Sequence, residues 1–172
     1  MKMRLEKYSE SDRALYERLV FNEETMGMNL GRTFTEEEAA FFFQAVLEQN
    51  SEGNEFGFYK VFVGEPEKEE YIGMGAITQN EEYEAPEIEY MLLPQFWNKG
   101  YGTELVEILL NMVKGSATIV AITDPNNIYS RKILLKKGFE SVKQYRNDDD
   151  EPAELFRLSS LCPISRSFRK RS

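Results

Sequence analysis

EIEYMLLPQFWNKGYGTEL, residues 87–105, is the stretch that decides the fold. Its start alternates in polarity and then becomes the apolar run 91–93, which is typical of a strand that enters a core. Pro94 ends that strand. Over residues 103–114 the polar positions recur at a spacing of three or four on an otherwise apolar segment. This spacing indicates a helix that is buried on most of its circumference.

The turn between this strand and this helix contains Gly100 and Gly102. Glycines let the backbone approach a ligand closely, and the free amides at a helix N-terminus suit a phosphate. Leu105 occupies the third glycine position of the dinucleotide fingerprint, and the sequence contains no nucleoside-triphosphate loop. Taken alone, two glycines are explained equally well by a tight strand-to-helix turn.

The composition bounds the class of protein. The chain has 172 residues, of which 41% are hydrophobic and 30% charged, as in an ordered globular protein with a substantial core. We expect one domain over residues 1–160 and a basic tail over residues 161–172 that lies in solvent. No apolar run approaches the roughly 18 residues of a membrane span, and the N-terminus lacks a signal-peptide core. These features predict a cytoplasmic protein that does not associate with a membrane.

Missing residue types exclude several chemistries. The chain has no histidine and a single cysteine, Cys162, which excludes histidine-based triads, the HExxH zinc site and an internal disulfide. We expect no metal. The formal net charge of −9 argues against a nucleic-acid partner and is compatible with amine-bearing substrates. Any catalysis must use carboxylates, tyrosines, hydroxyls, lysines or the backbone.

The remaining patterns predict the order of elements. An opening strand and two capped helices precede a hairpin formed by residues 56–63 and 71–78. Residues 117–122 predict a buried strand that makes a parallel crossover with the central strand. A short helix over 128–137 and a final hairpin complete the order strand, two helices, three strands, helix, strand, helix, two strands. This order predicts the α+β class, with a mixed sheet covered by helices.

The region that contains the two N-terminal helices is the least informative. Residues 22–33 are expected to form a loop that borders a cleft. Phe41, Phe42 and Phe43 cannot all face one side of a helix, so core packing leaves at least one of them unexplained. No motif in this region identifies a substrate.

Two separated motifs resemble those of the GNAT acetyltransferase superfamily. The turn 97–102, with sequence WNKGYG, is similar to the acetyl-CoA loop Q/R-x-x-G-x-G/A. The second motif is Asn127 followed by Ser130 and the pair Gly138-Phe139. The motifs occur in the right order, with one apolar helix and one apolar strand between them. Trp97, in place of Gln or Arg, is similar to the RimJ and RimL branch of ribosomal-protein N-terminal acetyltransferases.

The resemblance implies the GNAT fold and acetyl-CoA as the acyl donor. It implies a pantetheine along the end of the central strand and a diphosphate on the amides of the turn, which agrees with the glycines and the helix N-terminus. The implied cofactor-binding residues are Met91, Leu92, Leu93, Asn98, Lys99, Gly100, Tyr101, Gly102, Thr103, Asn127 and Ser130. Asn127 is explained equally well as a helix N-cap. Arg131, Lys132 and Lys136 are candidates for the 3′-phosphate of the cofactor, with a solvated helix face as the alternative.

Acetyl transfer requires a base and a donor for the oxyanion. An amine attacks only when it is neutral, so a carboxylate collects its proton, and a backbone amide near Leu92 is the expected oxyanion donor. Glu87 and Glu89 lie two apart on one strand and face the same side. One of them is the expected base, and Glu87 matches the acid common in the branch. The alternative is that both cover a solvated face of the sheet.

Leu134 stands where many members of the superfamily have a tyrosine that protonates the leaving thiolate. Ser130 and Tyr129 are the candidates to replace that tyrosine, with solvent as the alternative. Ser130 completes the expected catalytic set with Glu87 and Glu89. The general acid is otherwise unassigned.

The resemblance therefore implies an N-acetyltransferase that moves an acetyl group from acetyl-CoA to a primary amine in a ternary complex. The expected acceptor is a protein N-terminus, an amino acid, a polyamine or another small amine, and the expected protein is a monomer or homodimer. The alternative, motivated by Leu134, is a catalytically silent acyl-CoA-binding sensor.

Overall fold

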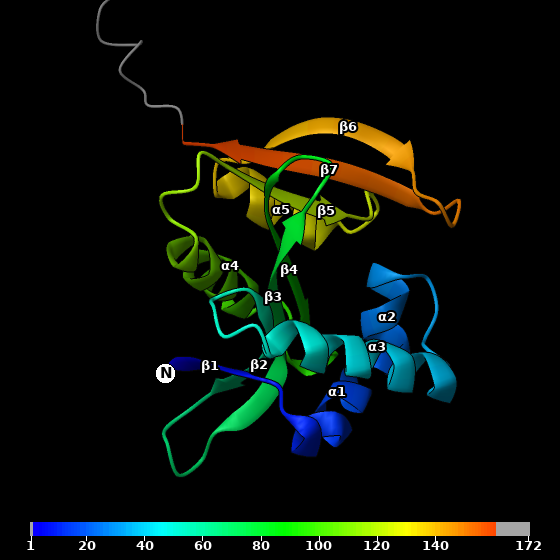
Figure 1. Ribbon diagram of the computed structural model, residues 1–172, viewed down its shortest axis with the longest axis vertical. Helices are drawn as coiled ribbons and strands as arrows, with labels where there is room; N and C mark the ends of the chain where they lie inside the picture. The colour runs from blue at the N-terminus through cyan, green and yellow to red at the C-terminus, as the bar shows by residue number, and fades with distance from the viewer. Residues whose placement is uncertain (1, 161–172) are drawn as a thin grey trace, which may run out of the picture.

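The computed structural model describes residues 2–160, whose seven strands form one sheet flanked by helices (Figure 1). The strands are β1 (Met3–Lys7), β2 (Gly57–Val63), β3 (Glu70–Asn80), β4 (Ala85–Leu92), β5 (Thr118–Thr123), β6 (Glu140–Arg146) and β7 (Pro152–Ser159). The helices are α1 (Arg13–Val20), α2 (Glu23–Asn29), α3 (Glu36–Asn50), α4 (Tyr101–Met112) and α5 (Ile128–Lys136), with short 3₁₀ turns at Glu10–Asp12 and Pro94–Phe96. The predicted basic tail and Cys162 lie outside the described residues.

The strands follow the order β1-β2-β3-β4-β5-β7-β6 across the sheet. All neighbouring strands are antiparallel except β4 and β5, which α4 connects as a parallel crossover. The β4–β5 register aligns Glu87 with Val120. Beyond that pair the two strands line a cavity, so the sheet is open at its centre. The predicted α+β class, both hairpins and the parallel crossover are confirmed.

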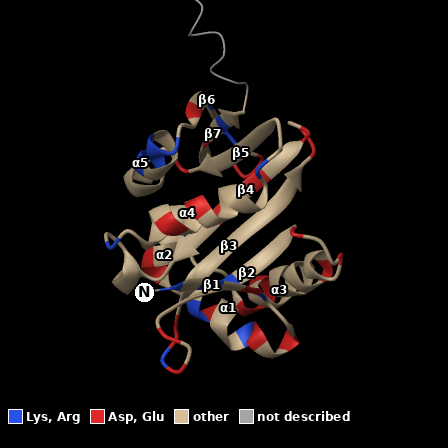
Figure 2. Cartoon of the chain, turned by 90° about the vertical axis from the view of Figure 1, so that its left-hand side faces the viewer, with Lys and Arg blue, Asp and Glu red and all other residues tan. Residues whose placement is uncertain are grey.

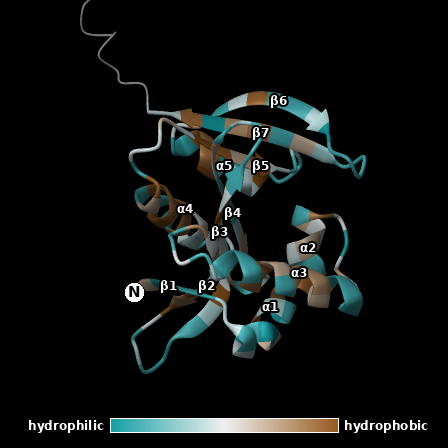
Figure 3. Ribbon diagram, in the orientation of Figure 1, coloured by the Kyte–Doolittle hydropathy of each residue, from teal (hydrophilic) through white to brown (hydrophobic). Residues whose placement is uncertain are grey.

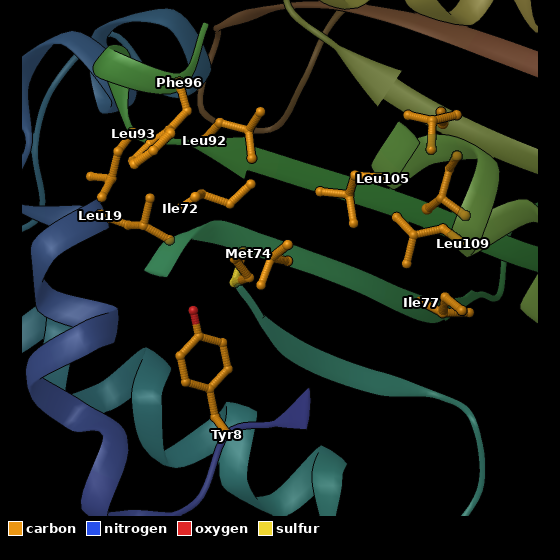
Figure 4. Close-up of a cluster of buried hydrophobic side chains, with 14 of the residues drawn as sticks. Tyr8, Leu19, Ile72, Met74, Ile77, Leu92, Leu93, Phe96, Leu105 and Leu109 are labelled. Carbon is orange, nitrogen blue, oxygen red and sulfur yellow. The ribbon is translucent and has the colours of Figure 1, made fainter. Parts of the chain in front are cut away.

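The core lies on both faces of the central strands. Figure 1 shows α4 on one side of β3 and β4, and α1 to α3 on the other. Gly75 of β3 lets α4 come close, because a Cβ there would lie 3.0 Å from Cδ1 of Leu105. On the opposite face Leu19 of α1 packs toward Ile72 (Figure 4). Hydrophobic residues are prominent on α4, whereas the tip of the β6–β7 hairpin is hydrophilic (Figure 3).

The loop predicted for residues 22–33 is wrong, because most of it is the helix α2. Asn22 caps this helix by accepting a hydrogen bond from the Thr25 amide at 2.9 Å. The buried Thr25 hydroxyl donates to the Leu92 carbonyl at 3.1 Å. A short helix with an internal glycine, Gly27, has little intrinsic stability. Packing against β4 therefore stabilises α2. The local sequence pattern does not reveal this contact, because its two residues are far apart in the chain.

The start of α4 and the burial of the α3 side chains can be compared with the sequence predictions. α4 begins at Tyr101, earlier than the predicted start at Thr103. The phenylalanines of α3 separate as expected: Phe43 is buried, whereas Phe41 is 70% exposed. α3 begins with a capping box, in which Thr35 and Glu38 bond each other's amides, an arrangement typically worth about 1 kcal/mol.

Candidate active site

The turn that precedes α4 contains two residues with left-handed backbone conformation. Asn98 and Gly100 have positive φ angles of 58° and 86°, which turn the chain sharply from β4 into α4. The first amides of a helix have no partner within the helix and are available to an anion. Gly102 lets α5 approach, because a Cβ there would lie 2.9 Å from Cδ1 of Ile133. The turn therefore presents helix amides beside α5.

A cavity of about 240 Å³ lies beside this turn. Residues from α2, β4, the turn and α5 line it. Most of the predicted cofactor-binding residues are among them, namely Met91, Leu92, Asn98, Gly100, Gly102, Thr103, Asn127 and Ser130. Leu93, Lys99 and Tyr101 are not among the lining residues. The tertiary structure thus brings the strand end, the glycine turn and the start of α5 into one site.

Backbone groups at the end of β4 are partly engaged. The Leu92 carbonyl accepts hydrogen bonds from Trp97 Nε1 at 2.8 Å and from Thr25 Oγ1 at 3.1 Å. These bonds involve only the carbonyl of Leu92. The predicted hydrogen bond to the oxyanion would come from the Leu92 amide. The side chain of Leu93 is 3% exposed and lies in the core near Phe96 (Figure 4). Any contact of Leu93 with a cofactor thus falls to its backbone.

The start of α5 contributes polar groups. Asn127 is the N-cap of α5 and accepts a hydrogen bond from the Ser130 amide at 3.1 Å, and it also lines the cavity. Lysine and arginine gather on α5 (Figure 2). Lys132 lines the cavity, whereas Arg131 is engaged elsewhere: its Nε donates to Glu154 at 2.7 Å. Lys132 is therefore the better placed of these two candidates for a phosphate.

A second cavity, of about 190 Å³, lies in the opening between β4 and β5. Residues 88–91 of β4 face residues 121–123 of β5 across it, and Leu134 of α5 contributes an apolar wall. Four residues line both cavities: Asn29, Tyr90, Met91 and Ser130. The two cavities therefore adjoin at these four residues.

The second cavity separates the two candidate bases. Glu89 lines it and is only partly exposed. Burial, together with the nearby Glu87 carboxylate, raises the pKa of Glu89 to about 7. Glu87 does not line either cavity, and it accepts a hydrogen bond from Asn80 Nδ2 at 2.8 Å. Burial raises the pKa of Glu87 as well, and the Asn80 bond opposes that shift. Of the two candidate bases, Glu89 is the one that lines a cavity.

Tyr90 is a residue of this site that the sequence analysis missed. Its phenol oxygen lies 2.7 Å from Ser130 Oγ and 3.4 Å from the Ser130 carbonyl. Burial raises the pKa of Tyr90 to about 12, while the Ser130 hydrogen bond acts in the opposite direction. The strand pattern only showed that Tyr90 faces away from Glu89; the contact between β4 and α5 gives it a partner.

Within residues 2–160, no group of three or more metal-ligating side chains is close enough to hold an ion. In the same part of the chain, no helix is both long and apolar enough to span a membrane.

A family model described as "Acetyltransferase (GNAT) domain" matches residues 2–140. The chain belongs to the GNAT acetyltransferase family. No curated protein sequence matches the chain. Membership of this family identifies the domain as an acetyl-CoA-dependent acetyltransferase.

Solved structures show the same fold at low sequence identity. An aminoglycoside acetyltransferase, AAC(6')-Ib, in complex with coenzyme A has a TM-score of 0.73 at 18% identity, covering 92% of this chain and 95% of that one. RimL, a ribosomal L7/L12 α-N-protein acetyltransferase in complex with coenzyme A, has a TM-score of 0.73 at 17% identity, covering 92% of this chain and 94% of that one. Spermidine N-acetyltransferase from Vibrio cholerae, in complex with coenzyme A and spermine, has a TM-score of 0.70 at 13% identity, covering 91% of this chain and 95% of that one. These likenesses confirm the fold.

Proposed function

We propose that this GNAT domain, over residues 1–160, transfers the acetyl group of acetyl-CoA directly to a primary amine in a ternary complex. One observation carries the proposal: the cavity beside the glycine turn adjoins a second cavity that Glu89 lines. Tyr90 and Ser130 line both cavities, which supports a donor in the first cavity close to Glu89 as the base.

The donor occupies the first cavity. Its diphosphate lies against the amides that begin α4, where Gly100 and Gly102 leave the backbone accessible. The pantetheine follows the end of β4, past Met91 and Leu92, toward the sheet opening. Lys132 is the cation that we assign to a phosphate of the donor, because it lines this cavity.

The acceptor amine occupies the second cavity, beside Glu89. A protein amine is mostly protonated near neutral pH and must lose a proton before it attacks. A base with a pKa of about 7 is ionised for a large part of the time at that pH and still binds a proton well. Glu87 supports this role at a distance, because its charge contributes to the raised pKa of Glu89.

The donor thioester lies where the two cavities meet. The Leu92 amide is the donor that we assign to the oxyanion, and the Ser130 hydroxyl is the donor assigned to the departing sulfur. Ser130 lines both cavities, which supports this assignment. Leu134 is fully buried and supplies no hydrogen-bonding group.

The acceptor class remains a primary amine of one of four kinds: a protein N-terminus, an amino acid, a polyamine or another small amine. The names of the structural neighbours, which include acetyltransferases of a protein N-terminus and of spermidine, support this range. The turn WNKGYG, residues 97–102, supports the RimJ and RimL branch within it.

The test is amine-dependent thiol release. The purified protein is incubated with acetyl-CoA and a panel covering the four acceptor kinds, and released thiol and acetylated product are measured by absorbance and mass spectrometry. The wild type is expected to release thiol with at least one amine, and E89Q to lose that release. E70Q, which changes an exposed carboxylate of β3, is the matched control and is expected to keep full activity.

The sensor alternative has a distinct signature in the same experiment. A protein that only binds acetyl-CoA would be stabilised by it against heat and would show no amine-dependent release with any acceptor. That pair of results would replace the enzyme proposal with the sensor.

A further inference from the structure

Two hydroxyl groups meet at the junction of the two cavities. The Tyr90 phenol comes from β4 and the Ser130 hydroxyl from α5, and their oxygens are 2.7 Å apart. Ser130 is 7% exposed. Each hydroxyl can donate one hydrogen and accept others. The pair therefore has one hydrogen for the bond between its members and one that remains for another acceptor.

The chemistry of the two groups decides which hydrogen remains. When Tyr90 donates to Ser130 Oγ, the Ser130 hydrogen is free to point into the cavity. In the reverse arrangement Ser130 donates to Tyr90, and the phenol hydrogen is left beside the Ser130 carbonyl, at the longer distance of 3.4 Å. A phenol is the stronger donor, because it is more acidic than an alkyl hydroxyl. Its raised pKa also means that Tyr90 keeps its proton at neutral pH.

The other residues that line both cavities carry no hydroxyl group. Asn29 is one of them, and its Nδ2, which has two hydrogens, donates one to the Thr25 carbonyl at 2.7 Å. Trp97 Nε1 donates to the Leu92 carbonyl. Met91, the remaining residue common to both cavities, has no hydrogen to donate from its side chain. Ser130, held by Tyr90, is thus the hydroxyl donor at the junction.

We infer that Tyr90 is a positioning residue that acts through Ser130: by donating to Ser130 Oγ, it holds the serine hydrogen toward the sulfur of the thioester. This inference rests on the proposed function. A donated hydrogen bond also strengthens the bond that its acceptor donates in turn. Tyr90 therefore both orients the serine and makes it a better donor.

The step is balanced without any further reactant. The protonated amine first gives one proton to solvent. The neutral nitrogen then forms a C–N bond with the thioester carbon, and the proton that it loses in becoming an amide passes to the Glu89 carboxylate. The C–S bond then breaks, and its electron pair leaves on the sulfur. The resulting thiolate is stabilised by the hydrogen bond from Ser130, while Tyr90 and Ser130 both retain their protons. Coenzyme A leaves as the thiolate and equilibrates with solvent.

The test is a double-mutant cycle on Tyr90 and Ser130. S130A is expected to lower kcat about 100-fold, as loss of a donor to developing charge does. Y90F is expected to lower kcat about tenfold, the size of one hydrogen bond, and to leave the KM for acetyl-CoA within about twofold. The double variant is expected to match S130A, because Tyr90 has no effect once the serine hydroxyl is gone.

Y71F is the matched control. Tyr71 also shares a hydroxyl pair, with Tyr8 at 2.7 Å, but in the core away from the cavities. Y71F is expected to lose about as much thermal stability as Y90F and to keep the wild-type kcat. A fall in kcat with Y71F as large as that with Y90F would assign the Y90F effect to stability and overturn the inference.

A spectroscopic readout is independent of turnover. The ultraviolet absorbance of bound coenzyme A reports its thiolate as pH rises. The thiol pKa is expected to be higher in the Y90F complex than in the wild type, and highest in S130A. An unchanged thiol pKa in Y90F, or a Y90F effect that persists fully in the S130A background, would refute the role of Tyr90. Loss of activity in E89Q would still support the proposed function in that case.

Discussion

Glu89 of β4 and Glu154 of β7 are the same side chain in opposite electrostatic environments. Glu154 is fully buried and accepts hydrogen bonds from Arg131 Nε and Ser141 Oγ, each at 2.7 Å. Burial alone would raise its pKa, but the bonds from Arg131 and Ser141 hold that pKa below its usual value. Among the described residues, Glu89 has neither a hydrogen-bond nor an ion-pair partner. Burial and the charge of Glu87 therefore raise its pKa to about 7.

The difference separates a carboxylate that joins elements of the fold from the carboxylate that we propose as the base. Glu154 joins α5 to the last hairpin, so it fixes the helix that carries Asn127 and Ser130. Glu89 makes no comparable contact and faces a cavity. A carboxylate that is buried without a partner costs stability when it ionises, and a raised pKa in a cavity is the usual mark of an acid or base in catalysis.

The largest expected effect is on rate. E89Q is expected to lower kcat/KM for the acceptor about 10²- to 10⁴-fold, the range of general base catalysis. In the wild type, kcat/KM is expected to fall as pH drops below about 7, because Glu89 becomes protonated and cannot accept the amine proton. Measuring kcat/KM of the wild type and of E89Q from pH 5 to 9 gives both the loss of rate and the acidic limb. An E89Q profile with the same acidic limb would assign that limb to another group.

The next effect concerns stability and the partnered carboxylate. R131M leaves Glu154 buried without its cation, and the unfolding midpoint at pH 7 is expected to fall by about 6–12 °C. Differential scanning calorimetry measures it. The R131M/E154Q double variant is expected to recover part of the loss, because it removes the unpaired charge. A double variant less stable than R131M alone would show that the buried charge is not the cause.

A smaller effect concerns Glu89, the carboxylate without a partner. Its substitution is expected to raise stability, whereas R131M lowers it. The folded-state pKa of Glu89 lies above its unfolded value, so its favourable contribution is complete below about pH 4.5 and is lost as pH rises through about 7. E89Q is therefore expected to be more stable than the wild type at pH 8 by about 1–2 kcal/mol, a value discounted for partial exposure, and by less at pH 5. Urea unfolding at the two pH values measures the difference. Equal destabilisation by E89Q at both pH values contradicts it.

The smallest effect tests the coupling between the two acids on β4. E87Q removes a negative charge near Glu89, so the pKa of Glu89 is expected to fall and the acidic limb of the rate profile to move down by a few tenths of a pH unit. The maximal rate is expected to stay within about threefold of the wild type. A loss of rate in E87Q as large as that in E89Q would contradict the assignment of Glu89 alone as the base.

Much of this comparison was accessible from the sequence. The strand and helix periodicities predicted the central crossover, and alternation along β4 placed Glu87 and Glu89 on one face. Both effects are local, because they depend on the spacing of residues within one element. The missed helix α2 shows the limit: it is only seven residues long and contains Gly27, so it has little stability by itself, and the contact of Thr25 with Leu92 that stabilises it joins positions far apart in the chain.

By itself, the sequence determined the α+β class, the glycine turn before α4 and the two candidate bases, because backbone geometry and periodicity are properties of neighbouring residues. Only the tertiary structure decided that Glu89 faces a cavity while Glu154 has a cation, and that Tyr90 meets Ser130. A pKa and a hydrogen bond depend on what lies within a few ångströms in space. In this chain those neighbours come from strands and helices that the sequence keeps apart.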